Sequence, residues 1–221
     1  MKLMIFDTET TGLPKDRTVT KDNYHLWPRI VQLSYLIYDT DNNDINLIYD
    51  KIVKVDINIS SESVKIHKIT NEISNSKGVD IESVIFMFFH SLSYVDKLVG
   101  HNITFDLNMI KAELYRKLAT YNDNDSKCVH HYLKMLDTIN ISCTMRENTK
   151  LCNIVRTNTS GEYLKYPTLM ELHNHLFNTT PNNLHNSLND ILITLRCFVM
   201  INTNKDVYKM EHLRKYYDNI L

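Results

Sequence analysis

Three strand-like segments near the start of the chain place the strongest constraint on its fold. Lys2–Asp7 is a short apolar run, and Ile30–Asp39 and Leu47–Val55 are longer runs rich in β-branched and aromatic residues. The polar stretch Asp39–Asp44 between the last two fits a hairpin turn. A further short apolar run, Lys97–Gly100, lies among helical patterns. A three-stranded meander followed by strands that alternate with helices indicates a mixed α/β sheet.

The spacing of apolar residues predicts the remaining elements. Apolar side chains recur every three or four positions, as in amphipathic helices, in six segments. These are Ser60–Ile69, Ile81–Leu92, Asp106–Leu118, Thr168–Phe177, Ser187–Ile201 and Val207–Tyr217. The run Tyr132–Leu136 predicts a fifth strand, and the polar stretch Asn140–Tyr166 predicts an irregular segment.

Length and composition favour one α/β domain over residues 1–221. Of these 221 residues, 43% are apolar and 23% are charged, which is ordinary for a globular protein. We expect residues 138–166 to form a flexible loop or insertion and residues 203–221 to form a C-terminal helix. No apolar run reaches the roughly 18–20 residues of a membrane span, and the first residues do not form a signal peptide. We therefore expect a soluble, intracellular protein, cytoplasmic or nuclear.

Net charge and cysteine spacing limit the partners. The net charge of −1 lacks the basic excess of proteins that coat long nucleic acids, so any nucleic-acid substrate should be gripped over only a few nucleotides. The four cysteines form no CxxC pair, which favours free thiols. A zinc site is a weak alternative because its ligands would have unusual spacing. They would be Cys128, His130, His131, Cys143 and Cys152.

The first candidate site segment ends the first strand, at Asp7-Thr8-Glu9. Side chains alternate between the faces of a strand, so Asp7 and Glu9 point to the same side. Two carboxylates on one face repel each other unless a cation lies between them. The alternative is a strand that runs into a polar loop, where acidic residues are ordinary.

Two further acidic segments lie at predicted helix starts. Asp106 follows the strand that ends at Gly100, and Asp190 lies five residues after His185. The side chains of His185 and Asp190 converge if His185 lies in the loop before the helix and Asp190 lies in the first helical turn. Each segment alone has a simpler explanation, because Asp106 can stabilise helix N-terminal amides and Ser187 has capping-box spacing to Asp190. Together, four carboxylates and one histidine suit hard cations such as Mg²⁺ or Mn²⁺.

These motifs resemble those of the DEDDh (DnaQ-like) 3′–5′ exonucleases. The matching stretches are Phe6–Leu13, His101–Asp106 and His185-x4-Asp190, with shorter ones at Arg29–Leu33, Ile66–Thr70 and Asp137-Thr138. The family includes the epsilon-type proofreading subunit of bacterial DNA polymerase III, ribonuclease T and oligoribonuclease. The resemblance covers about residues 1–200. It implies a ribonuclease H-like fold, with a five-stranded mixed central sheet flanked by helices.

The resemblance also implies a reaction and its cofactors. Such enzymes hydrolyse phosphodiester bonds at the 3′ end with two divalent cations, Mg²⁺ or Mn²⁺, and release nucleoside 5′-monophosphates. Asp7, Glu9, Asp106 and Asp190 would hold the ions, with Asp7 bridging both. His185 would accept the proton of the attacking water, a role that suits an imidazole near neutral pH. None of these five residues is replaced, so the resemblance predicts an active metal-dependent exonuclease.

Seven further residues are expected to contact the substrate by the same resemblance. They are Thr10, Gly12, Leu13, His67, His101, Asn102 and Phe105. Gly12 would let the chain approach the terminal nucleotide closely. Leu13 and Phe105 would wedge or stack against bases, with ordinary core packing as the alternative for both. The two histidines and the asparagine would contact phosphate or sugar.

The expected partner is the 3′ end of a single-stranded nucleic acid, with DNA slightly favoured over RNA. The alternatives are an exoribonuclease that trims RNA or short oligoribonucleotides, an endonuclease on a related fold, and a non-catalytic nucleic-acid-binding module. The sequence leaves open a polymerase or repair partner and a homodimer. No membrane partner is expected.

Overall fold

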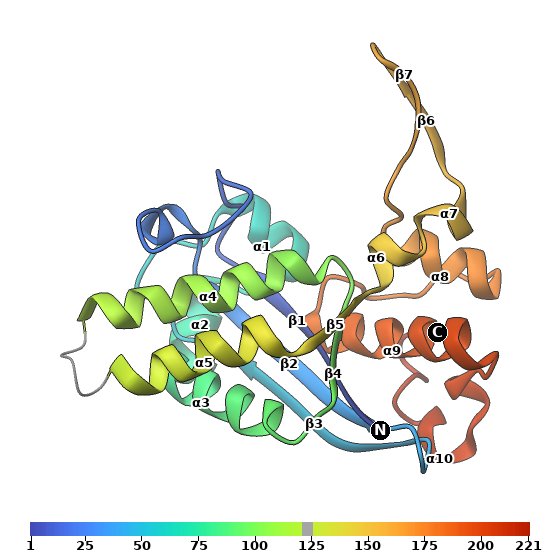
Figure 1. Cartoon of the computed structure of the whole chain (residues 1–221), viewed down its shortest axis with the longest axis horizontal. Helices are drawn as coiled ribbons and strands as arrows, with labels where there is room; N and C mark the ends of the chain where they lie inside the picture. The colour runs from blue at the N-terminus through green and yellow to red at the C-terminus, as the bar shows by residue number, and fades with distance from the viewer. Residues whose placement is uncertain (121–125) are drawn as a thin grey trace.

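The computed structural model describes residues 1–120 and 126–221 and contains a five-stranded sheet in the order β3-β2-β1-β4-β5 (Figure 1). The strands are β1 Lys2–Thr10, β2 Ile30–Asp39, β3 Asp44–Ile52, β4 Lys97–Gly100 and β5 Asn140–Cys143. β1 pairs antiparallel with β2 and parallel with β4, and β4 pairs parallel with β5. The sheet is therefore mixed, and the predicted fold class is confirmed.

Helices cover both faces of the sheet (Figure 1). One face packs against α3 Ile81–Leu92, α4 Ile103–Thr120 and α5 Ser126–Thr138, and the other against α8 Leu169–Phe177, α9 Ser187–Thr203 and α10 Glu211–Arg214. The shorter helices are η1 Tyr24–Leu26, α1 Ser61–His67, α2 Asn71–Lys77, α6 Thr144–Glu147, α7 Thr149–Cys152 and η2 Val207–Lys209. In the part of the chain that the structure describes, no helix has the length and apolar character needed to cross a membrane.

The central position of β1 explains its unbroken apolar sequence. Met4 and Phe6 pack into the core beneath α3–α5, whereas Leu3 and Ile5 pack into the core beneath α8–α10. All four side chains are at most 1% exposed. A strand buried on both faces needs apolar residues at every position, and this run ends where the first carboxylate, Asp7, begins the site.

The predicted fifth strand, Tyr132–Leu136, was wrong. These residues lie inside α5, and the fifth strand is β5, which follows it directly. Val129, Tyr132, Leu133 and Leu136 all face the core that lies beneath α3–α5. Their spacing of three and four residues is that of a helix, and the pattern appears only when the sequence window begins before Tyr132.

Two predictions near the C-terminal end also need correction. Asn140–Tyr166 is not irregular, because it contains β5, α6, α7 and a hairpin of β6 Val155–Asn158 and β7 Gly161–Leu164. This hairpin projects from the body of the molecule (Figure 1). The single helix predicted at Val207–Tyr217 is instead split into η2 and α10, because Met210 between them has an extended backbone (φ −81°, ψ 115°).

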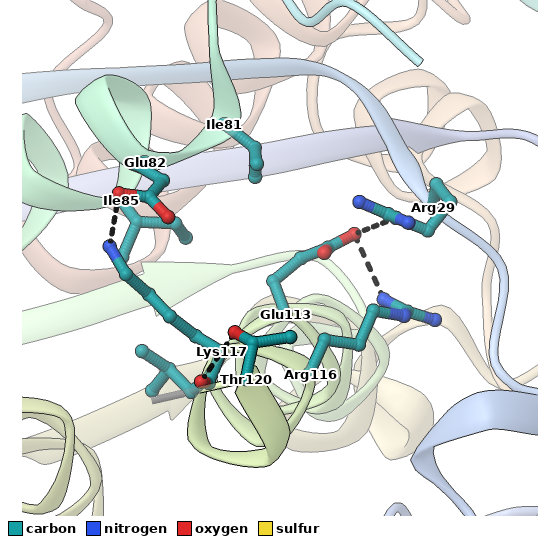
Figure 2. Close-up of a pocket in the computed structure, with 9 residues that line it drawn as sticks. Arg29, Ile81, Glu82, Ile85, Glu113, Arg116, Lys117 and Thr120 are labelled. Atoms are coloured by element: carbon teal, nitrogen blue, oxygen red, sulfur yellow. Dashed lines mark hydrogen bonds and ion pairs between the residues drawn. The ribbon is translucent and has the colours of Figure 1, made fainter. Parts of the chain in front are cut away.

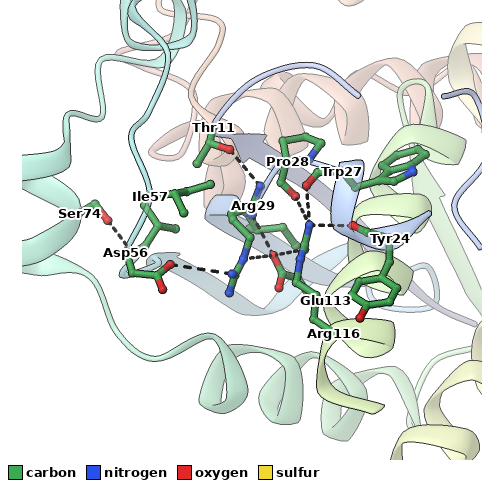
Figure 3. Close-up of polar contacts among 12 residues, drawn as sticks. Thr11, Tyr24, Trp27, Pro28, Arg29, Asp56, Ile57, Ser74, Glu113 and Arg116 are labelled. Carbon is green, nitrogen blue, oxygen red and sulfur yellow. Dashed lines mark hydrogen bonds and ion pairs between the residues drawn. The ribbon is translucent and has the colours of Figure 1, made fainter. Parts of the chain in front are cut away.

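A buried ion network holds the segment before β2 against α4 (Figure 3). Glu113 of α4 is 6% exposed and accepts a hydrogen bond from Arg29 Nε at 3.2 Å. Arg116 Nη1 lies 2.9 Å from the same Glu113 oxygen. Arg116 Nη2 also donates to three backbone carbonyls in residues 24–28. The long connection between β1 and β2 is thereby fixed to the helix that carries Asp106.

Candidate active site

β1 presents the first two carboxylates on one face. Asp7 and Glu9 are partly exposed and alternate with the buried Thr8 and Thr10. Because strand side chains alternate, Asp7 and Glu9 share the face of Ile5, which α9 covers. The sequence expectation that they point to one side agrees with this geometry.

α9 brings the third carboxylate to the same place. Ser187, the first residue of α9, has its Oγ 2.5 Å from Ser34 Oγ on β2. Ser34 is the register partner of Asp7, so this contact fixes the start of α9 beside the end of β1. Asp190 lies in the first turn of the helix, and one oxygen from each of Asp7, Glu9 and Asp190 lies within 4.8 Å of the others.

Asp106 approaches β1 from the opposite side, in the first turn of α4. It is 2% exposed, and its Oδ1 accepts hydrogen bonds from Thr8 N at 3.0 Å and Thr8 Oγ1 at 2.7 Å. Thr8 faces away from Asp7 and Glu9 on the strand, so Asp106 lies behind them. The structure thus gathers all four predicted acids at one end of the sheet, three within ligand distance and the fourth anchored on Thr8.

Burial raises the pKa of all four carboxyl groups, and repulsion by neighbouring acids adds to it at Asp7, Glu9 and Asp106. Burial is the largest cause at each, and it helps to raise the pKa of Glu9 to about 8 and those of Asp106 and Asp190 to about 7. The pKa of Asp7 rises well above its usual range, through burial and then the charges of the other three acids. Hydrogen bonds from Thr8 lower the pKa of Asp106 only in part. Crowded carboxylates of this kind fit divalent cations, which would neutralise the repulsion.

His185 lies in the loop that enters α9, as the sequence analysis required for it to meet Asp190. Its backbone N–H donates to both Asp190 carboxylate oxygens, at 3.2 and 3.3 Å. Its φ of 67° is in the left-handed region, which is uncommon for a residue other than glycine. The side chain is exposed. The capping-box alternative is wrong, because the N-cap is Asn186 and Ser187 lies inside the helix.

A pocket of about 450 Å³ opens beside Glu9. Five of the seven predicted substrate contacts line it, namely Thr10, Gly12, Leu13, His67 and Phe105. Leu13 is 85% exposed, so core packing is wrong as its explanation. Phe105 is partly buried and also packs against the core beneath α3–α5. A Cβ added at Gly12 would meet no protein atom within 4 Å, so the packing of the protein does not require glycine there.

His67 has both ring nitrogens engaged inside the protein. Nδ1 accepts a hydrogen bond from Ile69 N at 3.0 Å, so the neutral ring carries its proton on Nε2 and donates it to Thr10 O at 3.2 Å. The side chain is 5% exposed, and burial lowers its pKa. His67 therefore holds the backbone that lines the pocket.

His101 and Asn102 lie outside this pocket. The His101 ring lies 3.0 Å from Thr144 Oγ1 through Nδ1 and donates to Pro167 O at 3.0 Å through Nε2. Burial lowers the pKa of His101 to about 4, so the ring is neutral at physiological pH. Asn102 has a left-handed backbone (φ 65°) in the turn before α4. The geometry assigns His101 to holding protein segments together.

A second cavity, of about 220 Å³, lies between α3 and α4 (Figure 2). Its walls include the Arg29–Glu113 pair and the ion pair of Lys117 with Glu82, at 2.9 Å. None of the four clustered acids lines it. The cavity borders the ion network that fixes α4 rather than the candidate site.

The alternative zinc site is not formed. Among the residues that the structure describes, the group of Asp7, Glu9 and Asp190 alone has metal-ligand spacing. The proposed zinc ligands do not come together in this way. They are Cys128, His130, His131, Cys143 and Cys152. Sequence analysis in turn missed the hydroxyl contacts of Thr8, Ser34 and Ser187, which depend on packing between distant segments.

Comparison with known proteins identifies the class. The model of the RNase T family, described as exonuclease, matches residues 4–198. The chain belongs to this exonuclease family, which confirms the resemblance to the DnaQ-like 3′–5′ exonucleases and the prediction of a metal-dependent nuclease that acts on nucleic acid. No curated protein matches the sequence.

Solved exonuclease structures share the fold. A structure of exonuclease X in complex with 5′-overhanging duplex DNA is 22% identical, with a TM-score of 0.54, over 96% of this chain and 98% of that chain. Exonuclease I from Methylocaldum szegediense is 20% identical, with a TM-score of 0.60, over 94% of this chain. E. coli exonuclease I with a 5cy-dA13 oligonucleotide is 13% identical, with a TM-score of 0.59, over 95%. The chain spans 42% of each of these two exonuclease I chains.

Proposed function

We propose that this exonuclease acts on single-stranded DNA and removes nucleoside 5′-monophosphates one at a time from its 3′ end. The observation that carries the proposal is the group Asp7, Glu9 and Asp190, with oxygens within 4.8 Å of one another beside a pocket of about 450 Å³. DNA is favoured because the similar structures of exonuclease X and E. coli exonuclease I contain overhanging duplex DNA and a dA13 oligonucleotide.

We assign two divalent cations, Mg²⁺ or Mn²⁺, to the four acids, because hard cations prefer carboxylate oxygens. By the family resemblance, Asp7 would be shared between the ions, and its pKa is raised by burial and then by the charges of the other three acids. Glu9, Asp106 and Asp190 would complete the set. When bound, such cations lower the pKa of a coordinated water and stabilise charge that develops on the phosphate.

The remaining roles fall to groups of the chain itself. His185 accepts the proton of the attacking water, and its backbone contact to Asp190 holds it at the edge of the acid cluster. The backbone of residues 10–13 borders the terminal nucleotide, and the exposed Leu13 side chain packs against a base. His67 and His101 act indirectly, by holding the segments that surround the substrate.

A time course with matched oligonucleotides tests the proposal. Single-stranded DNA and RNA of about 20 nucleotides, labelled at the 5′ end, would be incubated with the protein in Mg²⁺, in Mn²⁺ and in EDTA. We expect a ladder that shortens one nucleotide at a time, mononucleotide products and faster loss of DNA than of RNA. Asp7→Asn, which removes the shared carboxylate, should eliminate the ladder and weaken cation binding.

Other product patterns would point elsewhere. Internal cuts indicate an endonuclease, and tight binding without cleavage in either metal indicates a non-catalytic module. Faster degradation of the RNA strand would replace the DNA proposal with an exoribonuclease that uses the same acids.

A further inference from the structure

We propose that residues 144–167, hereafter the arm, bind the nucleic-acid strand upstream of its terminal nucleotide. The arm comprises α6, α7 and the β6–β7 hairpin, which projects from the body of the molecule (Figure 1). The inference rests on the proposed function, since it extends the binding surface of the same site. No residue of the arm belongs to the acid group or lines the pocket beside Glu9.

The arm begins at the edge of the sheet that carries the acids. β1, β4 and β5 run parallel, so their carboxyl ends lie at one edge. Asp7 and Glu9 lie near that end of β1, and Thr144 follows directly after β5. α6 also packs against α9, which supplies Asp190. A strand whose 3′ end reaches the acids therefore passes near the base of the arm.

A buried bridge fixes the two ends of the arm. The His101 ring contacts Thr144 Oγ1 at the start of the arm and Pro167 O at its end, each at 3.0 Å. Thr144 is 1% exposed, and its Oγ1 also lies 3.3 Å from Gly100 O. Both contacts are made by His101, which lies in the short loop between β4 and α4, five residues before Asp106. The base of the arm has a defined position relative to the acids.

The hairpin presents a cation and an aromatic ring on one face. Arg156 and Tyr163 are register partners, so their side chains lie side by side on one surface of the two-stranded sheet. Both are exposed, and Tyr163 is 48% exposed. Aromatic rings stack on bases of any sequence, and guanidinium groups pair with phosphates. This combination suits a single strand.

Charge favours nucleic acid over an acidic or purely apolar partner. Within the arm, basic side chains outnumber acidic ones, although the whole chain has a net charge of −1. The basic residues are Arg146, Lys150, Arg156 and Lys165, and the acidic ones are Glu147 and Glu162. Lys165 is paired with Glu171 at 2.7 Å, and Arg156 contributes the positive charge of the face that it shares with Tyr163.

The double variant Arg156→Ala/Tyr163→Ala tests the arm. All residues of β6 and β7 are exposed, so the variant should keep the wild-type melting temperature. We expect KM for a strand of about 20 nucleotides to rise about tenfold, because base stacking and a phosphate contact are lost. Cleavage of a dinucleotide, which lies within the acid site, should be unchanged. Thr157→Ala, on the opposite face of the same hairpin, is the matched control.

A second variant tests the whole hairpin. Lys165 N donates to Ile154 O at 2.8 Å, so the chain ends that would remain lie close enough for a Gly-Gly link in place of residues 155–164. This deletion should raise KM for the long strand at least as much as the double variant does. Binding of the same strand in EDTA, followed by fluorescence anisotropy, should weaken in parallel.

The outcomes separate the two proposals. If the double variant and wild type cleave and bind the long strand equally well, the proposed role of the arm is overturned. It is also overturned if the double variant loses as much activity on the dinucleotide as on the long strand. Wild-type protein that cleaves neither substrate would overturn the proposed function, and the anisotropy comparison would then still decide whether the arm holds the strand.

Discussion

Single hydroxyl groups decide how the acids of this site are arranged. Asp7 and Glu9 share a face because a strand alternates, but Thr8 between them holds Asp106 through two hydrogen bonds. The Ser34–Ser187 contact fixes Asp190 in a similar way, through the start of its helix. The acids supply the charge, and these small side chains supply the positions.

His185→Ala should lower turnover by about 10²–10⁴-fold, the usual contribution of a general base. Its contact to Asp190 uses the backbone N–H, so cation binding should persist. Single-turnover kinetics and cation titration would measure the two effects separately. His175→Ala, at an exposed position on α8, is the control, and full activity of the His185 variant would remove His185 from the reaction.

Gly12→Ala should weaken substrate binding without destabilising the protein. No protein atom lies within 4 Å of the added Cβ, so the melting temperature should stay within about 1 °C of wild type, as for a neutral surface change. If the terminal nucleotide contacts this backbone, KM should rise about tenfold, a loss of about 1.4 kcal/mol in binding. An unchanged KM would show that the substrate does not approach Gly12.

Asp190→Asn should stabilise the metal-free protein at alkaline pH. Burial raises the pKa of Asp190 to about 7, so the folded state binds this proton more strongly than the unfolded chain does. The free energy of unfolding of wild type therefore falls as pH rises from about 4 to about 7. Removing the charge should raise the melting temperature in EDTA by roughly 5 °C at about pH 8.5. At about pH 5, where wild-type Asp190 is protonated, the gain should be much smaller. A lower melting temperature at the alkaline pH would contradict this reasoning.

At the scale of elements, α9 both carries an acid of the site and anchors itself through a buried ion pair. Its first turn carries Asp190, and near its middle Arg196 forms two hydrogen bonds of 2.8 Å to Asp206. Arg196 Nη1 also donates to His173 Nε2 of α8 at 2.8 Å, which requires a neutral ring, and the pKa of His173 is lowered to about 4 through burial and then the charge of Arg196. The Arg196–Asp206 pair secures α9 against the segment that follows it.

Asp206→Ala should destabilise the fold by about 3–5 kcal/mol, because the buried Arg196 would lose its counter-charge. The side chains of Arg196 and Asp206 are only 6% and 5% exposed. Urea unfolding would measure the loss, with the exposed Asp218→Ala as the control. A loss below about 1 kcal/mol, typical of surface ion pairs, would show that water reaches this pair.

For the whole molecule, the arrangement of the helices and the net charge limit where a substrate can bind. Helices on both faces leave the carboxyl edge of the central strands open, and the acids, pocket and arm all lie along it. The net charge of −1 provides no broad basic surface. Under the proposed function, we therefore expect substrate binding to depend on local contacts at this edge.

Strand binding should accordingly depend only moderately on salt. A grip on about three or four phosphates of a single strand gives a slope of roughly −2 to −3 in log K against log salt concentration. Anisotropy titrations of an Asp7→Asn variant between about 50 and 200 mM salt would measure this slope. A slope near −7 or steeper would indicate a long electrostatic track that the charge distribution does not predict.

The sequence by itself determined the fold class, the β1–β3 meander and the identity of the four acids and His185. The fold class and the meander follow from strand alternation and helical periodicity, and the five candidate site residues follow from motifs that resemble those of the exonuclease family. It failed at Tyr132–Leu136, where a short apolar run fits either a strand or one face of a helix.

Only the tertiary structure decided the rest. It placed Asp106 behind Asp7 and Glu9. It showed that His101 connects Thr144 to Pro167 and that the polar stretch after β5 contains a hairpin. The physical reason is that the positions of Asp106 and His101 depend on contacts between residues more than 40 positions apart, whereas the short, fully exposed hairpin strands lack an apolar pattern. No local pattern records such contacts, because packing selects them only once the sheet and helices have assembled.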